Sequence, residues 1–314
     1  MERHRLLPVG LLVFALVLPA GCGHQGTAEE AEAPSRLAAP APVSTTWRAY
    51  GGALRDCVRT ETETEQGLET WSAEFRDEHG NREVTTLADG TLVSVETDVA
   101  AAEVPRSIRE HAARILGAPP ETFEHARLAV YELEERAPTG EVSERFVDPF
   151  GVVLMTRHLD EESEQEAEES IADLPEAARA AIEREAQMAP LEEIQKERDG
   201  GHEVHAASWT SADGPRELKV LDDGSPISLE IETGRLPARV AALLRDAEEP
   251  ARDASNTEDE SSEEPTEPAV ERMLLDVWEV EATVDGITRQ ALIRPTGEIL
   301  GDVTAEPQAA DSDD

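Results

Sequence analysis

The sequence predicts an α+β fold of tandem units, each a helix followed by antiparallel strands, in two layers. Two repeated features predict it. One is an aliphatic–proline pair that opens a helical pattern, and the other is a glycine turn between two strand-like segments. Both recur in the same order along the 314 residues, at intervals of roughly 60 residues that are typical of a repeated supersecondary unit. We therefore expect four units, paired into two lobes.

The helices are predicted from apolar residues spaced three and four apart. "LPEAARAAIEREA" places Leu174, Ala178 and Ile182 on one stripe. Its proline suits a first helical turn, where the missing amide hydrogen costs nothing. "VPRSIREHAARIL", from Val104, and "LPARVAALL", from Leu236, have the same design. The first unit lacks this opening, and we expect "WRAYGGALRDC" to take its place.

Glycine turns are expected to form the last hairpin of each unit. "LADGTLVSVE" and "LDDGSPISLEIE" carry Asp–Gly, which provides the positive backbone angles of a tight hairpin. "DPFGVVLMT" and "RPTGEILGD" keep only proline and glycine, which still form a turn. A calcium loop would need the acids in every copy, so we interpret these stretches as structural. The turn-forming glycines are Gly90, Gly151, Gly224 and Gly297.

Composition separates the folded units from segments that are expected to lack fixed structure. Single units of this size bury too little apolar surface to be very stable alone, so we expect the first to pair with the second and the third with the fourth. The predicted divisions are 1–21 (signal peptide), 22–45 (tether), 46–103, 104–159, 174–235 and 236–302 (units one to four), 160–173 (acidic linker), 246–268 (acidic insert in the fourth unit) and 303–314 (acidic tail).

The N-terminal segment predicts export and a lipid anchor. Basic residues precede an apolar run from Leu6 to Leu18, as in a secretory signal. "LPAGC" then resembles a bacterial lipobox, although Pro19 stands where a large aliphatic residue is expected. We favour lipidation of Cys22 over secretion with an unmodified thiol. This places the chain outside the cytoplasm of a bacterium, on the periplasmic or surface side, and leaves Cys57 without a partner for an intrachain disulfide.

The charge of the chain restricts its partners. The formal net charge is -41, from 69 acidic and 28 basic residues. Such a field repels nucleic acid and anionic lipid and favours cations or basic proteins. Solubility, or adaptation to a salty habitat in which salt screens the repulsion, explains the same composition. We expect no nucleic-acid partner, and the sequence gives no indication of oligomeric state.

The sequence shows no signature of catalysis. "HEVH" at 202–205 places its histidines three apart on a predicted strand, whereas zinc-protease helices carry them four apart on one face. Serine-nucleophile motifs and phosphate-binding glycine loops are missing from the sequence. We therefore expect a non-enzymatic protein with no catalytic residue, no metal site and no cofactor.

Aromatic residues on predicted strands are the best candidates for a partner-binding face. Alternation sends one face of a strand into the core and leaves the other exposed. If Val204 and Ala206 point inward, Trp209 and His205 point to the open face. The remaining candidates are Trp71, Tyr131 and Trp278.

The order of these motifs resembles the PepSY and PepSY-like family. The resemblance is strongest in residues 174–232, where "LPEAARAAI", "HEVHAASW" and "LKVLDDGSPISLE" follow one another in family order. Residues 104–159 and 236–302 match less closely, and 46–97 match only in their strands. The resemblance implies a secreted or envelope-attached protein that inhibits or regulates a peptidase. The related beta-lactamase inhibitory protein fold implies binding on the concave face of a sheet.

Together these observations favour a lipid-anchored, extracytoplasmic, non-enzymatic protein-binding module. The resemblance implies that it inhibits or regulates a peptidase or another envelope enzyme, and the charge favours a basic protein partner. The alternative is a structural envelope lipoprotein whose acidic segments bind divalent cations weakly.

Overall fold

A computed structural model describes residues 38–77, 80–136, 142–158, 167–199, 201–231, 236–244 and 270–307. The predicted signal peptide, Cys22 and the whole of the predicted acidic insert at 246–268 lie outside these residues. Within the described ranges, no helix has the length and apolar character needed to cross a membrane.

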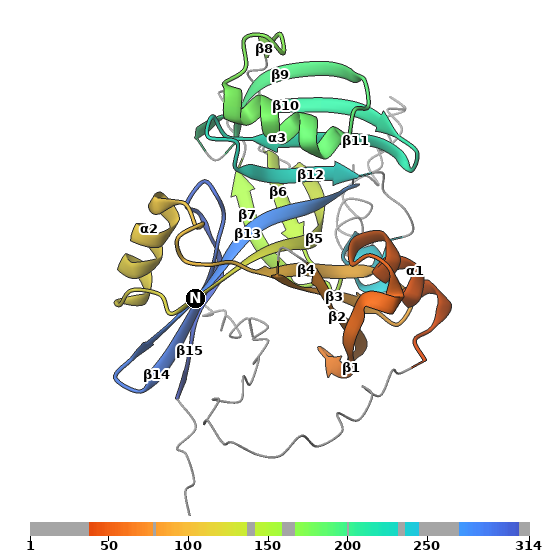
Figure 1. Cartoon of the computed structure of the whole chain (residues 1–314), viewed down its shortest axis with the longest axis vertical. Helices are drawn as coiled ribbons and strands as arrows, with labels where there is room; N and C mark the ends of the chain where they lie inside the picture. Colours follow the sequence, from red (N-terminus) through yellow and green to blue (C-terminus); the bar gives the residue numbers. More distant parts are fainter. Residues whose placement is uncertain are drawn as a thin grey trace, which may run out of the picture.

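The strands of the described chain form one antiparallel sheet of 15 strands (Figure 1). They are β1 (Cys57–Glu65), β2 (Leu68–Asp77), β3 (Gly80–Leu87), β4 (Leu92–Asp98), β5 (Thr122–Arg136), β6 (Val142–Val147), β7 (Val153–His158), β8 (Ala167–Glu168), β9 (Leu191–Asp199), β10 (His202–Ser211), β11 (Gly214–Val220), β12 (Pro226–Ile231), β13 (Val270–Val284), β14 (Ile287–Ile293) and β15 (Ile299–Pro307). The helices are α1 (Ala41–Tyr50), α2 (Arg106–Leu116) and α3 (Glu176–Ala186), with a 3₁₀ turn at Leu54–Asp56 and a further helical segment at 238–244.

Two long central strands, β5 and β13, hold the sheet together. They pair with each other from Val270 opposite Leu133 to Glu281 opposite Thr122. On its outer edge β5 pairs first with β4 and then with β6, and β13 pairs first with β12 and then with β14. The main path therefore runs β1–β2–β3–β4–β5–β13–β12–β11–β10–β9–β8, and the hairpins β6–β7 and β14–β15 branch from it.

The helices cover one face of this sheet, and two of them are exchanged between units. Helices α1 and α3 pack against strands of their own units. Helix α2 instead packs on Val280 and Ile293, which belong to β13 and β14. The segment 238–244 packs through Val240 on Tyr131 and Val147, which belong to β5 and β6. The second and fourth units thus cover each other's strands.

The predicted fold class, tandem helix-plus-sheet units paired into two lobes, is wrong. A single sheet runs through the described chain, and strands dominate over helices. The opposite face of β5 and β13 is covered by the two branch hairpins, through residues such as Phe146 and Leu300. The apolar stripe of a helix predicts that it covers a sheet, but not which sheet segment it covers, because that depends on long-range strand pairing.

Four hairpins close with the same turn. In each, a glycine N–H donates to the carbonyl oxygen three residues earlier, at 2.8 to 3.0 Å. Each glycine has a φ between 79° and 90°, in the left-handed region that other residues rarely adopt, and each hairpin contains a register shift beside the turn. The glycines are Gly90, Gly151, Gly224 and Gly297.

These turns differ in what lies against them. A Cβ at Gly224 would lie 2.5 Å from the carbonyl oxygen of Ala177, in the first turn of α3, whereas a Cβ at Gly297 would meet nothing within 4 Å. The turn at Gly224 therefore packs directly against the first turn of α3. Glycine is required there both for its backbone angle and for its small size.

Replacing Gly224 and Gly297 separately by alanine distinguishes the cost of the left-handed backbone angle from the cost of the close contact with α3. We expect Gly297→Ala to lower the free energy of unfolding by about 1–2 kcal/mol, the cost of a left-handed alanine. Gly224→Ala should cost more, because α3 must also move. Urea denaturation of both variants measures the difference, and equal losses would show that α3 does not depend on this close approach.

Candidate functional site

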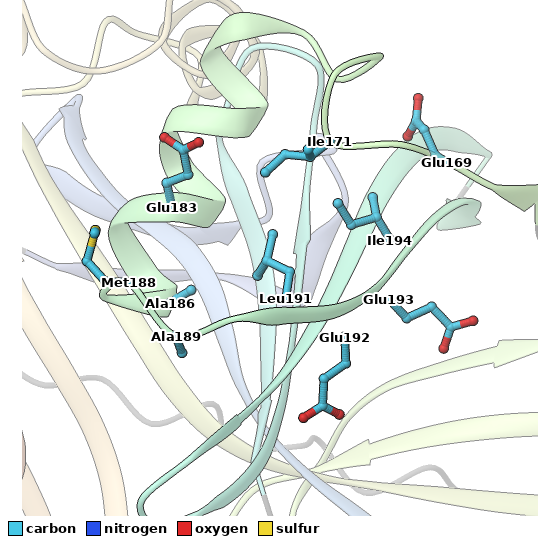
Figure 2. Close-up of a pocket in the computed structure, with 10 residues that line it drawn as sticks. All are labelled: Glu169, Ile171, Glu183, Ala186, Met188, Ala189, Leu191, Glu192, Glu193 and Ile194. Carbon is cyan, nitrogen blue, oxygen red and sulfur yellow. The ribbon is translucent and has the colours of Figure 1, made fainter.

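A groove of about 590 Å³ lies between the C-terminal end of α3 and the first half of β9, the strand next to the short edge strand β8 (Figure 2). Three segments form it: the chain that follows β8, the end of α3 with the turn after it, and the first half of β9. The lining residues are Glu169, Ile171, Glu183, Ala186, Met188, Ala189, Leu191, Glu192, Glu193 and Ile194.

The floor of the groove is apolar and open to solvent. Leu191 and Ile194 pack against the core under α3 and are only partly buried. Ile171 is 39% exposed and Met188 is 95% exposed. Ligand sites are concave surfaces in which apolar side chains are combined with a few polar groups. The groove is therefore a candidate site for an apolar ligand group.

The turn after α3 holds Met188 outside the core. Gln187 and Met188 have φ values of 49° and 72°, both in the left-handed region. Residues other than glycine adopt this conformation at a cost of about 1–2 kcal/mol each. The Ala189 N–H donates to the Ala186 carbonyl oxygen at 2.9 Å and closes the turn. The left-handed Gln187 is the C-cap of α3, a common way for a helix to end, and Met188 adds a second left-handed residue to the turn.

Carboxylates surround the apolar floor. Glu183 on α3, Glu192 and Glu193 on β9, and Glu169 after β8 all line the groove, and no basic side chain lines it among the described residues (Figure 2). A concave surface with charges of one sign concentrates the electrostatic field and attracts groups of the opposite sign. The arrangement fits a ligand that combines cationic and apolar groups.

His205 holds one wall of the groove in place. Its Nδ1 lies 2.7 Å from Glu169 Oε2, and its Nε2 lies 2.8 Å from Asp222 Oδ1. A neutral imidazole carries one N–H, so both contacts are hydrogen bonds only when both ring nitrogens are protonated. The acidic turn before Gly224 thus contributes to the site indirectly, because it fixes the histidine that fixes Glu169.

The prediction that Trp209 and His205 lie on an open face is wrong. Each is 3% exposed. Trp209 lies in the core under α3, together with Ala207. The helix therefore covers the strand face that the sequence assigned to solvent. Val204 is also buried, so β10 is covered on both faces. The alternation of side chains along a strand shows which residues share a face. It does not show which of the two faces a helix covers.

The other predicted binding residues lie on separate strands and do not form one site. Tyr131 is 1% exposed, beneath the segment 238–244. The indole nitrogen of Trp71 donates to Glu69 Oε1 at 2.7 Å. Trp278 packs against His125, with ring centroids 5.0 Å apart. Of the five candidates, only His205 borders the groove. The acidic composition was the one feature of the sequence that indicated the carboxylates around the groove. No feature of the sequence identified Ile171 or Met188 as part of a site.

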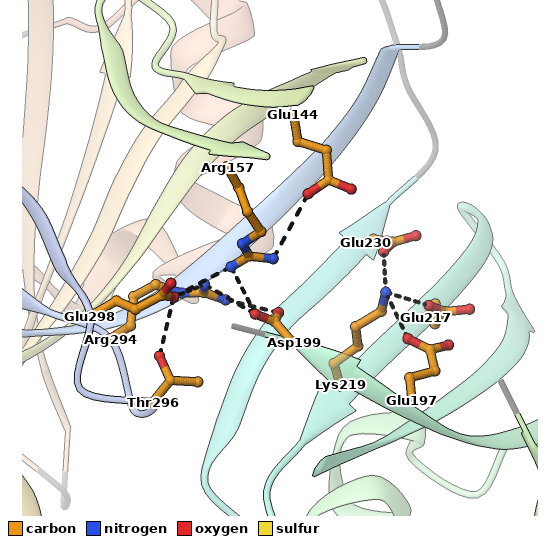
Figure 3. Close-up of polar contacts among 10 residues, drawn as sticks. All are labelled: Glu144, Arg157, Glu197, Asp199, Glu217, Lys219, Glu230, Arg294, Thr296 and Glu298. Atoms are coloured by element: carbon orange, nitrogen blue, oxygen red, sulfur yellow. Dashed lines mark hydrogen bonds and ion pairs between the residues drawn. The ribbon is translucent and has the colours of Figure 1, made fainter. Parts of the chain in front are cut away.

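A network of charged residues lies on the other face of the third unit (Figure 3). Lys219 lies 3.1 Å from Glu197, 3.5 Å from Glu217 and 3.6 Å from Glu230. Burial raises the pKa of Glu230 to about 7, although Lys219 opposes the shift. Among the described residues, no group of histidine, cysteine and acidic side chains is arranged to hold a metal ion. The ion pairs of Lys219 join β11 to β9 and to β12.

A second, separate cluster of ion pairs joins three units. Asp199, at the end of β9, lies 2.8 Å from Arg157 on β7 and 3.0 Å from Arg294 in the turn before β15 (Figure 3). Burial opposes ionisation of Asp199, but the two guanidinium groups hold its pKa below the ordinary value. Glu298 contacts both arginines as well. These ion pairs fix the third unit, and with it the groove, against the centre of the sheet.

Comparison with known proteins gives little further information. No family model matches the chain, so the resemblance to the PepSY family is not confirmed, and no curated protein matches it significantly. A DUF2874 family protein from Bacteroides ovatus shares 15% identity, with 39% of this chain and 89% of that chain covered and a TM-score of 0.23. A candidate periplasmic protein of the same family from Bacteroides vulgatus shares 12% identity, with coverages of 45% and 98% and a TM-score of 0.20. Similarities this weak support no inference about function.

Several buried carboxyl groups make stability depend on pH. Burial, together with Glu144 and Glu271, raises the pKa of Glu132 to about 8, and burial raises the pKa values of Glu124 and Glu279 to about 7. These groups bind protons more tightly in the folded state than in the unfolded state, where their pKa is near 4.5. Stability should therefore fall as pH rises from about 4.5 to 8.

Glu132→Gln tests this pH dependence. We expect the substitution to raise the free energy of unfolding at pH 8 by roughly 1–3 kcal/mol and to change it little at pH 5, where the folded protein already carries the proton. Urea denaturation across this range measures the effect, with Glu103→Gln at an exposed position as the control. A gain that is the same at both pH values would contradict protonation of Glu132 as its cause.

Proposed function

We propose that the chain is a non-enzymatic binding module that acts outside the cytoplasm, anchored through lipid on Cys22, and that its groove binds a basic segment of a partner protein. The groove itself carries the proposal, because an apolar floor is combined with a rim of four glutamates and no basic lining residue in the described chain. The signal-like N-terminus supports the extracytoplasmic location.

The two parts of the groove have different roles in binding. Burial of apolar groups against Ile171, Leu191 and Met188 supplies affinity, at about 25 cal/mol for each Å² removed from water. The carboxylates select a cationic partner and speed its encounter with the groove. The partner that the family resemblance implies is a peptidase or another envelope enzyme.

Charge reversal of the rim tests this proposal. The probe is a synthetic peptide of alternating lysine and leucine, and its binding to the full-length chain is followed by fluorescence anisotropy at physiological salt. We expect Glu183→Lys combined with Glu192→Lys to weaken binding about tenfold or more, which corresponds to about 1.4 kcal/mol. Glu103→Lys, which changes the charge at an exposed site on another unit, is the control. Equal weakening by the control would show only a general effect of net charge.

Met188→Gly tests the apolar floor. Glycine adopts a φ of 72° readily, so the substitution should keep the free energy of unfolding or raise it by up to about 1 kcal/mol. Binding of the same peptide should nevertheless weaken, because the methionine side chain is lost from the groove. Thermal unfolding and peptide titration of one preparation measure both effects, and unchanged affinity would remove Met188 from the site.

A further inference from the structure

The groove contains an open strand edge. Strand β9 pairs with β10 from Leu191 to Asp199, with a register shift that leaves Glu192 without a paired residue on β10. On its other edge it pairs with the two residues of β8, at Lys196 and Gln195, and Ile194 accepts a hydrogen bond from the Glu169 N–H at 2.9 Å. No strand of the described chain pairs with this edge at 191–193. The open part of β9 is therefore also the part that lines the groove.

We propose that an extended basic segment of a partner protein binds in the groove as an added strand on β9. The inference rests on the proposed function and specifies its geometry. Unpaired N–H and C=O groups at the edge of a sheet are a template for another strand, and peptide recognition by strand addition uses them. The open edge at 191–193 is about 10 Å long at 3.3 Å per residue, so about three residues of the partner would pair.

The residues around the open edge of β9 determine which side chains a partner segment would need. Successive residues of a strand point to opposite faces. A segment on this edge would place one set of side chains over the apolar floor, near Ile171 and Leu191, and the alternate set toward the carboxylates of Glu192 and Glu193 (Figure 2). The matching sequence alternates aliphatic residues with lysine or arginine.

Charge excludes the acidic insert of this chain as an occupant. The stretch "DAEEPARDASNTEDESSEEPTEP" at 246–268 has the same sign as the rim, and "DEESEQEAEESIA" at 160–172 already forms part of the groove through Glu169 and Ile171. Like charges brought together in a concave site are unfavourable. A basic segment of another protein fits both the rim and the floor, and the open edge adds backbone hydrogen bonds that do not depend on the partner's side chains.

Backbone methylation of the lysine–leucine peptide tests strand addition. N-methyl groups on every second residue remove the N–H donors along one edge of the extended peptide, and methylation of the other residues removes those along the opposite edge. With the full-length chain, we expect one methylated peptide to bind about tenfold or more weakly than the parent, because it loses the backbone N–H donors that face β9. The other should bind within about threefold of the parent, because its methylated edge faces solvent.

The outcomes distinguish this inference from the proposed function. If the parent peptide and both methylated peptides bind equally, the groove binds basic segments but not as a strand, and the inference is wrong. If the parent peptide does not bind at all, both the proposed function and the inference are wrong. Amide hydrogen exchange gives a second readout, since strand addition should slow exchange within residues 191–193 and leave β1, at the opposite end of the sheet, unchanged.

Discussion

The pairing of β5 with β13 is the constraint on which the rest of the structure depends, and a buried ion pair lies at its centre. Asp276 is fully buried on β13 and lies 3.3 Å from Arg127 Nε on β5. Arg127 also donates two hydrogen bonds to Glu185, near the end of α3, at 3.0 and 3.1 Å. Because α3 forms one wall of the groove, this chain of charges connects the central strands directly to the candidate site. Loss of one member of such a buried pair leaves an uncompensated charge, which is strongly unfavourable.

The groove exists because β9 is covered incompletely. The residues after β8 protect one half of its edge, and the end of α3 stops short of the other half. Two left-handed residues, Gln187 and Met188, carry the chain from α3 back to β9 and keep the methionine exposed. A more stable design would place glycine there and bury the apolar floor. Under the proposed function, this exposed apolar surface is what the partner contacts.

The local features of the fold could be predicted from sequence, whereas their assembly could not. The proline-led helices and the four glycine turns depend on neighbouring residues, and they are where the sequence placed them. Which strands a helix covers depends on the long-range pairing of β5 with β13, so the exchange of α2 and the burial of Trp209 had no local signal. The groove brings together Glu169, Glu183 and Glu192 across the turn after α3. Its acidity was visible in the composition, but its location was not.

The acidity of the chain has different consequences inside and outside the fold. Buried carboxyl groups such as Glu132 take up protons as pH falls, which relieves repulsion in the sheet and stabilises the folded state. At the rim of the groove, Glu183, Glu192 and Glu193 are exposed, whereas the Glu169 side chain is 15% exposed and lies against His205. Under the proposed function, a basic segment would reduce the repulsion among these carboxylates. A ligand that binds only the folded state stabilises it by mass action. Binding of a basic segment should therefore be coupled to the stability of α3 and β9, because both form the walls of the groove and both are tied to the central strands by ion pairs.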